Sequence, residues 1–400
     1  MSTSPDATPF PRRLLLPLAG GNFVVGVGTL VIASMLPALS SDLGASIAAV
    51  GQLLAGYAIA LAIGAPTIAA LTSRADRRVL LTVALTLFGA LHLLAAAMPG
   101  YGPLFAVRVV TGFVAAVVTP QAASTAALLV PGNMRGRALG FIFLGFSLAT
   151  VVGVPFGGYV ASLMGWRATL GVVGVMALAV ALWMWLQIPA GLHIVPMDRA
   201  AWLRLARHPA LLLVVAVTVV QGSAQFVLYS YLVPLMQAQA GLDAARAGAV
   251  FGVLGVFGLL GNLMGARLMD RLGPARVVQI ALWLMLLAFA LWPLIRLSDG
   301  HWLVLGLVCA IWGLPVFACN AAQQARLVSL APDLASASIA LNSSGIFLGQ
   351  AIGAAIGGWV IAGQGYTPLN WWAFVIMLLA IGVSVLAGRA AVRSPGPQIG

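Results

Sequence analysis

Long apolar runs of about 20 residues or more alternate with short segments that hold most of the charged residues. A helix needs about 20 apolar residues to cross the hydrocarbon core of a bilayer. Breaks at charged or Pro/Gly-rich positions predict twelve spanning helices, over residues 14–39, 47–72, 79–98, 103–129, 138–163, 167–188, 210–237, 245–268, 277–297, 302–328, 335–362 and 369–388. The first run follows Arg12 and Arg13 as in a signal peptide, but it is too long for one and lacks a convincing cleavage site. We therefore expect a retained helix.

Composition supports a chain that is surrounded largely by lipid. Of the 400 residues, 62% are hydrophobic and 7% are charged, whereas soluble domains carry about a quarter charged residues. The 20 basic residues are all Arg and the 8 acidic residues are all Asp. The net charge of +12 is scattered without a basic face or interleaved aromatic residues, which argues against nucleic-acid binding. Cys309 and Cys319 lie ten residues apart on one apolar run, about 15 Å along a helix, too far apart for a disulfide.

The arginines predict the orientation of the chain. With the N-terminus in the cytoplasm, three arginines lie outside (Arg167, Arg246 and Arg296) and Arg108 lies within a span. The other 16 then lie in cytoplasmic segments: Arg12, Arg13, Arg74, Arg77, Arg78, Arg135, Arg137, Arg199, Arg204, Arg207, Arg267, Arg271, Arg276, Arg326, Arg389 and Arg393. Since cytoplasmic loops of membrane proteins are enriched in Lys and Arg, we expect both termini in the cytoplasm.

The longest connection divides the chain into two halves. Residues 189–209 carry Asp198, Arg199, Arg204 and Arg207 around Trp202, a pattern typical of an amphipathic segment at the membrane surface. We interpret it as a cytoplasmic linker between a six-helix bundle at 1–188 and a second at 210–400, which ends in a short cytoplasmic tail. A regulatory or lipid-binding segment is the alternative.

An internal repeat supports this division. GFSLATVVGVPFGGYV at 145–160 aligns with GIFLGQAIGAAIGGWV at 345–360, an offset of 200 residues. Glycines four residues apart allow helix backbones to approach closely. We therefore assign helix packing to Gly145, Gly153, Pro155, Gly157, Gly353 and Gly357, with sliding contacts during a conformational cycle as the alternative.

Three motifs then indicate a family. LTSRADRRVLL at 71–81 and ARLMDRLGPAR at 266–276 are similar to a signature Gly-x-Leu-x-Asp-Arg-x-Gly-Arg-Arg, although Ser73 replaces its Asp and Asp76 its second Gly. Arg108 with Gly112 is similar to an Arg-centred motif, and the stretch from Gly145 to Gly158 to a Gly/Pro-rich exporter motif. In these motifs and its twelve spans the chain resembles the major facilitator superfamily, within it the twelve-span drug:proton antiporter branch and its arabinose-efflux-permease-like members.

The resemblance implies an all-α polytopic protein of a bacterial inner membrane, with twelve helices in two pseudo-symmetric six-helix bundles that rock about a central site. It also implies a latch formed by cytoplasmic loop charges. The candidates are Asp270, Arg271 and Arg276 in one half and Arg74, Asp76, Arg77 and Arg78 in the other. The alternative is that these residues only orient the chain.

Candidate substrate contacts are the polar residues inside the spans. Arg108 lies about five residues into its span, roughly 8 Å deep, where a charge is costly and usually faces a wet cavity or a partner. Gln221, Gln225 and Tyr229 recur at every fourth position, on one face of a helix that lines the cavity in this family. Further candidates are Asn22, Trp312, Asn320 and Asn342, for which packing or interhelical hydrogen bonding is the alternative.

No Asp falls inside a predicted span, so the cavity offers no carboxylate to titrate or to attract a cation. His92 is the remaining titratable group within a span, and we expect it to pack rather than to carry protons, because its span is peripheral in this family. Such a cavity suits a neutral or anionic solute.

These residues predict a secondary transporter, not an enzyme, and we expect it to export a sugar, nucleoside or drug-like solute. An uncoupled facilitator or an importer is the alternative on the same fold. A polytopic enzyme would need clustered catalytic or metal-binding residues, and the His and Asp residues are scattered. A P-loop requires Lys, which the chain lacks. We expect a monomer in the lipid bilayer with no cofactor, a small-molecule substrate, and protons as the candidate coupling ion.

Overall fold

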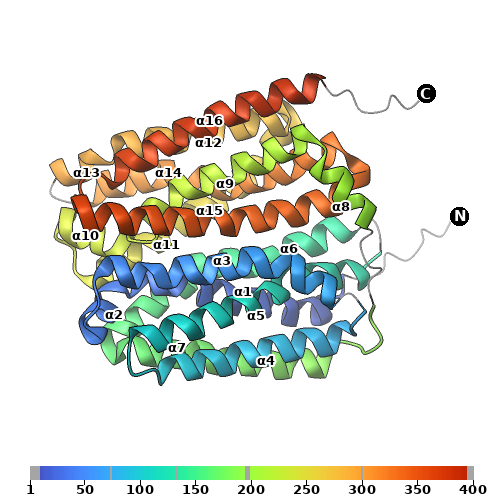
Figure 1. Cartoon of the computed structure of the whole chain (residues 1–400), viewed down its shortest axis with the longest axis horizontal. Coiled ribbons are helices and arrows are strands. Elements are labelled where there is room, and N and C mark those ends of the chain that lie inside the picture. The colour runs from blue at the N-terminus through green and yellow to red at the C-terminus, as the bar shows by residue number, and fades with distance from the viewer. Residues whose placement is uncertain (1–9, 73, 132–133, 194–198, 299–300, 394–400) are drawn as a thin grey trace, which may run out of the picture.

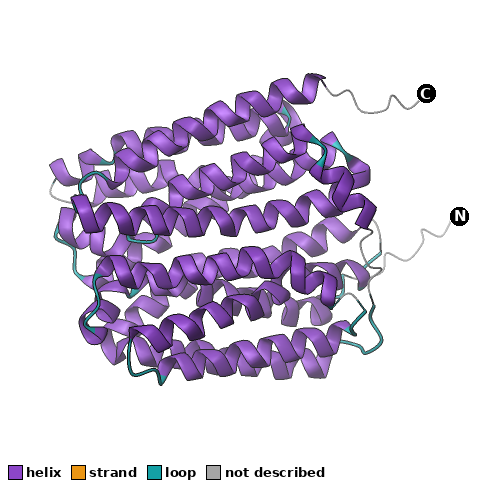
Figure 2. Ribbon diagram, in the orientation of Figure 1, coloured by secondary structure: helices purple, strands orange, loops and turns teal. Residues whose placement is uncertain are grey.

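The computed structural model describes residues 10–72, 74–131, 134–193, 199–298 and 301–393. The first part of the chain forms helices α1 (Arg12–Ser34), α2 (Leu36–Leu43), α3 (Ile47–Leu71), α4 (Arg77–Ala96), α5 (Tyr101–Leu128), α6 (Arg135–Leu148), a π-helical turn (Ala149–Gly153) and α7 (Val154–Gln187). The second part forms α8 (Arg199–Ala206), α9 (Pro209–Tyr229), α10 (Leu232–Ala240), α11 (Ala244–Leu272), α12 (Pro274–Leu291), α13 (Pro293–Leu297), α14 (Trp302–Leu330), a 3₁₀ turn (Pro332–Leu334), α15 (Ala335–Gln364) and α16 (Leu369–Arg393). Figure 2 shows helices and loops, and no strand, among the described residues.

Capping side chains and turn-forming residues set several helix ends. The side chains of Ser46, Asp76 and Asp243 each accept a hydrogen bond from the first turn of the helix that follows. This satisfies backbone N–H groups that have no partner inside the helix. Gly44 and Gly241 end α2 and α10 in the left-handed conformation, with φ of 60° and 61°, which glycine adopts without steric cost.

The predicted spans are confirmed, although 14–39 and 210–237 are interrupted where α1 ends at Ser34 and α9 ends at Tyr229. Eleven runs of the described chain are long and apolar enough to cross a membrane, and the longest, Arg135–Gln187, covers 53 residues. That run turns back at Gly165, whose φ of 83° and ψ of 163° are not helical. Two predicted spans, 138–163 and 167–188, meet at this turn, so the eleven runs make twelve crossings.

The crossings form two bundles, as the sequence predicts (Figure 1). Helices α1 to α7 make one bundle and α9 to α16 the other, and α8 lies at the same end of the molecule as the last turn of α16. The end with α2, α10 and α13 is opposite. We refer to these as the terminal end and the loop end.

The glycine repeat produces the same packing in each bundle. In the first, Gly145, Gly153 and Gly157 lie against Ala19, Val27 and Val31 of α1. In the second, Gly349, Gly353 and Gly357 lie against the carbonyls of Val219, Ser223 and Val227 of α9. Helices α1 and α9 are the first helices of their bundles, so each glycine stripe packs against the equivalent helix. These contacts lie within a bundle and therefore favour helix packing.

We expect Gly145→Val to destabilise the first bundle by about 1–3 kcal/mol, because its Cβ would overlap the carbonyl oxygen of Ala19 and a backbone atom cannot rotate away. The midpoint of thermal unfolding in detergent should fall. Gly140→Val on the same helix is the matched control, since a Cβ there meets no atom within 4 Å. Equal midpoints for the two variants would contradict this interpretation of the repeat.

Candidate functional site

Arg108 lies inside the first bundle and is held by three helices. Its side chain is 1% exposed, which excludes snorkelling to the membrane surface. The Nη1 atom donates a hydrogen bond to the carbonyl of Gly28 on α1 at 3.0 Å, and the guanidinium lies 4.2 Å from the ring centroid of Tyr57 on α3. The Tyr57 hydroxyl in turn lies 3.1 Å from the Thr29 hydroxyl. These contacts fix the direction of the guanidinium.

One edge of the Arg108 guanidinium has no partner. Neither Nε nor Nη2 makes a hydrogen bond with any described residue, although both are buried. These two N–H groups point in the same direction and match the two oxygens of a carboxylate or similar oxyanion. A buried donor without a partner is costly, so the edge is a candidate contact for a substrate.

His92 lies beside this cluster and is packed rather than exposed to lipid. It is 1% exposed, its Nδ1 lies 2.9 Å from the Phe88 carbonyl, and its ring lies 4.2 Å from the Phe88 ring. Its Nε2 has no partner and faces Gly28, where a Cβ would lie 2.7 Å away. Glycine at position 28 therefore allows α1 to approach both His92 and Phe88.

Amide side chains form a chain of hydrogen bonds in the second bundle. Gln225 Nε2 donates to Gln221 Oε1 at 2.6 Å, and Gln221 Nε2 lies 3.5 Å from Asn320 Oδ1 on α14. Gln221 and Gln225 therefore lie on one face of α9, as their spacing predicts. The hydrogen bond to α14 also fits the alternative of interhelical bonding.

Asn342 of α15 belongs to a second polar group, which joins α15 to α9 and α14. Its Oδ1 accepts a hydrogen bond from Thr218 at 2.6 Å, and Gln323 Nε2 donates to the Thr218 hydroxyl at 3.2 Å and to the Val214 carbonyl at 3.1 Å. Asn342 Nδ2 and Gln323 Oε1 have no partner among the described residues.

Tyr229 and Trp312 belong to an aromatic cluster instead of the amide chain. The ring of Tyr229 lies 4.9 Å from that of Phe251 and 6.4 Å from that of Trp312, which also contacts Phe289 and Trp292. Both the Tyr229 hydroxyl and Trp312 Nε1 are buried without a partner in the described structure. These groups can donate hydrogen bonds to a neutral polar solute.

Asn22 joins two helices of the first bundle. Its Nδ2 donates to the carbonyl of Ile142 on α6 at 3.1 Å, and the residue is fully buried. This contact fits the interhelical alternative for Asn22.

Tyr231 connects the two bundles near the loop end. It is fully buried, and its hydroxyl donates to the carbonyl of Ala354 on α15 at 2.8 Å. A Cβ at Gly51 of α3 would overlap its phenol ring, so glycine is required for this approach. A second contact joins the bundles where Gly255 of α11 meets the π-helical turn, since a Cβ there would lie 2.8 Å from the Cα of Val151. A π-helical turn is often found at functional sites.

The predicted latch residues of the second half are exposed. Asp270, Arg271 and Arg276 form no ion pair within the described chain. Arg74 is also exposed, and Ser73 lies outside the described residues. The latch therefore stays a prediction for another conformational state.

The other predicted latch residues contact their own bundle or the linker that follows it. Asp76 Oδ1 accepts a hydrogen bond from the backbone of Val79 at 3.1 Å, and its other oxygen accepts one from the backbone of Gly191. Burial opposes the charged form of Asp76, but backbone N–H donors outweigh it and hold the pKa of this carboxyl below its usual value. Arg78 lies 4.1 Å above the Trp185 ring.

Two of the sixteen arginines have buried side chains. Arg77 is 1% exposed and donates to Gln121 at 2.7 Å, and Arg326 is 4% exposed and donates to Ser384 at 3.3 Å. Both lie near helix ends, since Arg77 is the first residue of α4 and α14 ends at Leu330. The orientation that the sixteen arginines predict therefore stays a prediction.

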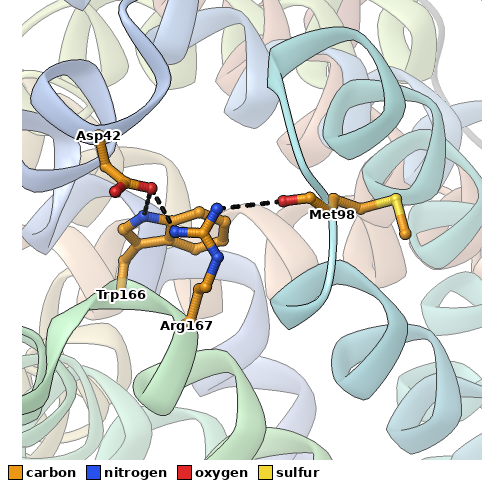
Figure 3. A network of polar contacts seen from close by, with 4 residues as sticks. All are labelled: Asp42, Met98, Trp166 and Arg167. Carbon is orange, nitrogen blue, oxygen red and sulfur yellow. Dashed lines mark hydrogen bonds and ion pairs between the residues drawn. The ribbon is translucent and has the colours of Figure 1, made fainter.

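Asp42 ties together three segments at the loop end (Figure 3). Its carboxylate accepts a hydrogen bond from Trp166 Nε1 at 3.0 Å and forms an ion pair with Arg167, whose Nη2 donates to the Met98 carbonyl at 3.2 Å. The bond from Arg167, followed by the bond from Trp166, holds the pKa of Asp42 below its usual value. Sequence spacing gave no signal for this contact between distant residues.

The family model described as Major Facilitator Superfamily matches residues 18–343. The chain belongs to the major facilitator superfamily. It is 26% identical over 369 residues to the uncharacterized MFS-type transporter YbcL of Bacillus subtilis, which covers 92% of this chain and 94% of that protein. It is 28% identical over 382 residues to the inner membrane transport protein YdhP of Escherichia coli K12, which covers 94% and 96%.

Solved structures of the superfamily share the fold. A D-xylose-proton symporter aligns with a TM-score of 0.76 at 16% identity, over 94% of this chain and 97% of the symporter. The human organic anion transporter MFSD10 aligns with a TM-score of 0.72 at 16% identity, over 94% and 100%. This major facilitator chain is a multi-pass inner-membrane protein and a secondary transporter, and its curated relatives are named as transporters, not enzymes.

Proposed function

We propose that this major facilitator protein exports a neutral or anionic small organic solute by alternating access. Bundles at 1–188 and 210–400, joined by a cytoplasmic linker at 189–209, would rock about a site between them. The observation that carries the proposal is the buried edge of Arg108 with two N–H groups free to bind an oxyanion.

A cationic solute fits these residues less well. The described spans hold Arg108 but no Asp at membrane depth, since Asp76 and Asp243 cap helices and Asp270 lies near the end of α11. A buried positive charge would repel a cation in a medium where charges are weakly screened. A sugar, nucleoside or drug-like solute with hydroxyl or carboxylate groups could instead use Arg108 together with Gln221 and Trp312.

Export through the drug:proton antiporter branch is the direction we favour. Its support is the Gly/Pro-rich motif from Gly145 to Gly158, which contains the π-helical turn at Ala149–Gly153 and packs against α11 of the other bundle. We also propose that both termini are cytoplasmic and that the protein acts as a monomer. An uncoupled facilitator or an importer is the second candidate.

We expect a proton gradient to drive solute flux without any single aspartate carrying the proton. Each Asp→Asn variant in turn, reconstituted in vesicles with an imposed pH gradient, should keep gradient-driven flux. A variant that loses gradient-driven flux but keeps solute exchange would contradict this proposal. If solute flux through the unmodified protein does not depend on the pH gradient, the protein is an uncoupled facilitator. A thermal-shift screen of sugars, nucleosides, organic acids and antibiotics would supply the test solute.

A further inference from the structure

A cavity of about 540 Å³ lies at the terminal end of the molecule, between the first turns of α1 and α6. Its volume falls within the range of small-molecule sites. Arg12 and Arg137 line it, together with Gly140. None of these residues belongs to the Arg108 cluster, so the cavity is separate from the candidate transport site.

The walls of the cavity are apolar and continue onto the outer surface of the bundle. Phe10 and Phe141 make an edge-to-face contact with ring centroids 5.9 Å apart. Leu16 and Leu144, one to two turns further along α1 and α6, are each 42% exposed. Exposed leucines at this position of a membrane-spanning helix offer an apolar surface for lipid chains. The cavity therefore has arginines at one side, Arg12 and Arg137, and an exposed apolar surface at the other, Leu16 and Leu144.

The positive charge of the cavity is not neutralised by the described chain. The guanidinium of Arg137 lies 4.5 Å from the Phe10 ring centroid, which holds it in place, and neither Arg137 nor Arg12 forms an ion pair with a described carboxylate. No acidic residue occurs in the first turn of α1 or α6. Two positive charges beside an apolar surface are complementary to a ligand with an anionic head and hydrocarbon chains.

We propose that this cavity binds one anionic phospholipid, with the phosphate between Arg12 and Arg137 and the acyl chains along Leu16 and Leu144. Basic pockets between spanning helices bind anionic headgroups in this manner. The site goes beyond the transport activity and does not depend on the substrate. If the termini are cytoplasmic, the lipid comes from the inner leaflet.

Native mass spectrometry of the purified full-length protein in neutral detergent tests the site. We expect phosphatidylglycerol to bind more tightly than phosphatidylcholine with the same acyl chains. The double variant Arg12→Gln/Arg137→Gln should lose about 30-fold in affinity for phosphatidylglycerol. The matched control Arg13→Gln/Arg135→Gln removes the same charge from the same two helix ends, outside the cavity lining, and should bind as the unmodified protein does.

A variant that fills the cavity with a side chain tests the site without changing its charge. Gly140→Phe places a ring in the cavity, and a Cβ at this position meets no atom within 4 Å, so the fold should tolerate it. We expect Gly140→Phe to reduce phosphatidylglycerol binding at least tenfold, with an unchanged midpoint of thermal unfolding in lipid-free detergent.

Four results would overturn the proposal. Equal losses in the cavity variant and the matched control would mean that only general charge attracts the lipid. Equal binding of the two lipids would exclude headgroup recognition. Competition by inorganic phosphate at the lipid's own concentration would identify a soluble anion as the ligand. A tenfold gain in lipid binding for Asp6→Asn would identify the N-terminal segment of the chain as the occupant.

Discussion

Arg108→Ala is expected to abolish transport. The substitution removes a buried charge of the first bundle and both unpartnered N–H groups that we assign to the solute. Hydrogen bonds to a charged group contribute about 1.5–3 kcal/mol each, so loss of two should reduce solute flux at least about 100-fold. Initial rates of solute uptake by proteoliposomes at equal protein density measure the effect.

Arg108→Lys separates the charge from the shape of the guanidinium. Lysine keeps the positive charge but lacks the planar pair of N–H groups, so we expect partial activity at best. Thermal unfolding of both variants serves as the folding control, because the Gly28 carbonyl loses its Arg108 donor in each. Arg108→Ala with flux near that of the unmodified protein, at an unchanged unfolding midpoint, would contradict the role of Arg108.

Gly51→Leu is expected to prevent closure of the loop end. Its side chain would occupy the space of the Tyr231 phenol, which seals α3 against α15. Overpacking costs about 1–3 kcal/mol, and here the cost falls on the closed state alone. The closed population should therefore fall by about 5- to 150-fold, and cycling with it.

Labelling of Ala354→Cys by a membrane-impermeant maleimide reports this closure, because Ala354 is fully buried beneath Tyr231. We expect rapid labelling when Gly51→Leu is also present and slow labelling without it. The native Cys309 and Cys319 are buried and provide a low background. Gly102→Leu, at the same end with no atom within 4 Å of its Cβ, is the matched control. Equal labelling in both backgrounds would show that Tyr231 does not hold the bundles together.

Apolar run length predicts the spans well because a bilayer requires continuous hydrophobic helices whatever their packing. It misses local changes inside a run. The predicted span 210–237 divides at Ser230 into α9 and α10, and the predicted span 138–163 contains the π-helical turn. Both irregularities lie where the helices meet the other bundle, at Tyr231 and at Val151. The hydropathy of a segment does not predict which of its residues contact the other bundle.

Only part of the candidate site could be predicted, because the sequence shows polar residues inside spans but not which of them meet. A charge inside an apolar run is visible in the sequence, and this identified Arg108. Its partner Tyr57 lies 51 residues earlier on another helix, and the sequence carries no signal that the two side chains meet. Gln323 and Thr218 were also missed, because single polar residues in spans are common and only the crossing of α9 and α14 brings them together.

The repeat is the strongest long-range signal in the sequence. The four glycines at 145–158 and their counterparts at 345–358 predicted two related halves, and the structure places each stripe against the equivalent helix. A small residue at close helix contacts is a packing requirement, so the pattern could be read without knowledge of either helix's position.

Solute counterflow in proteoliposomes tests the central claim most directly. Vesicles loaded with a neutral or anionic solute from the thermal-shift screen should accumulate the labelled solute transiently, and the Arg108→Ala variant should not. Cationic solutes should show no counterflow in either protein. Counterflow of a cation that persists in Arg108→Ala would contradict the account.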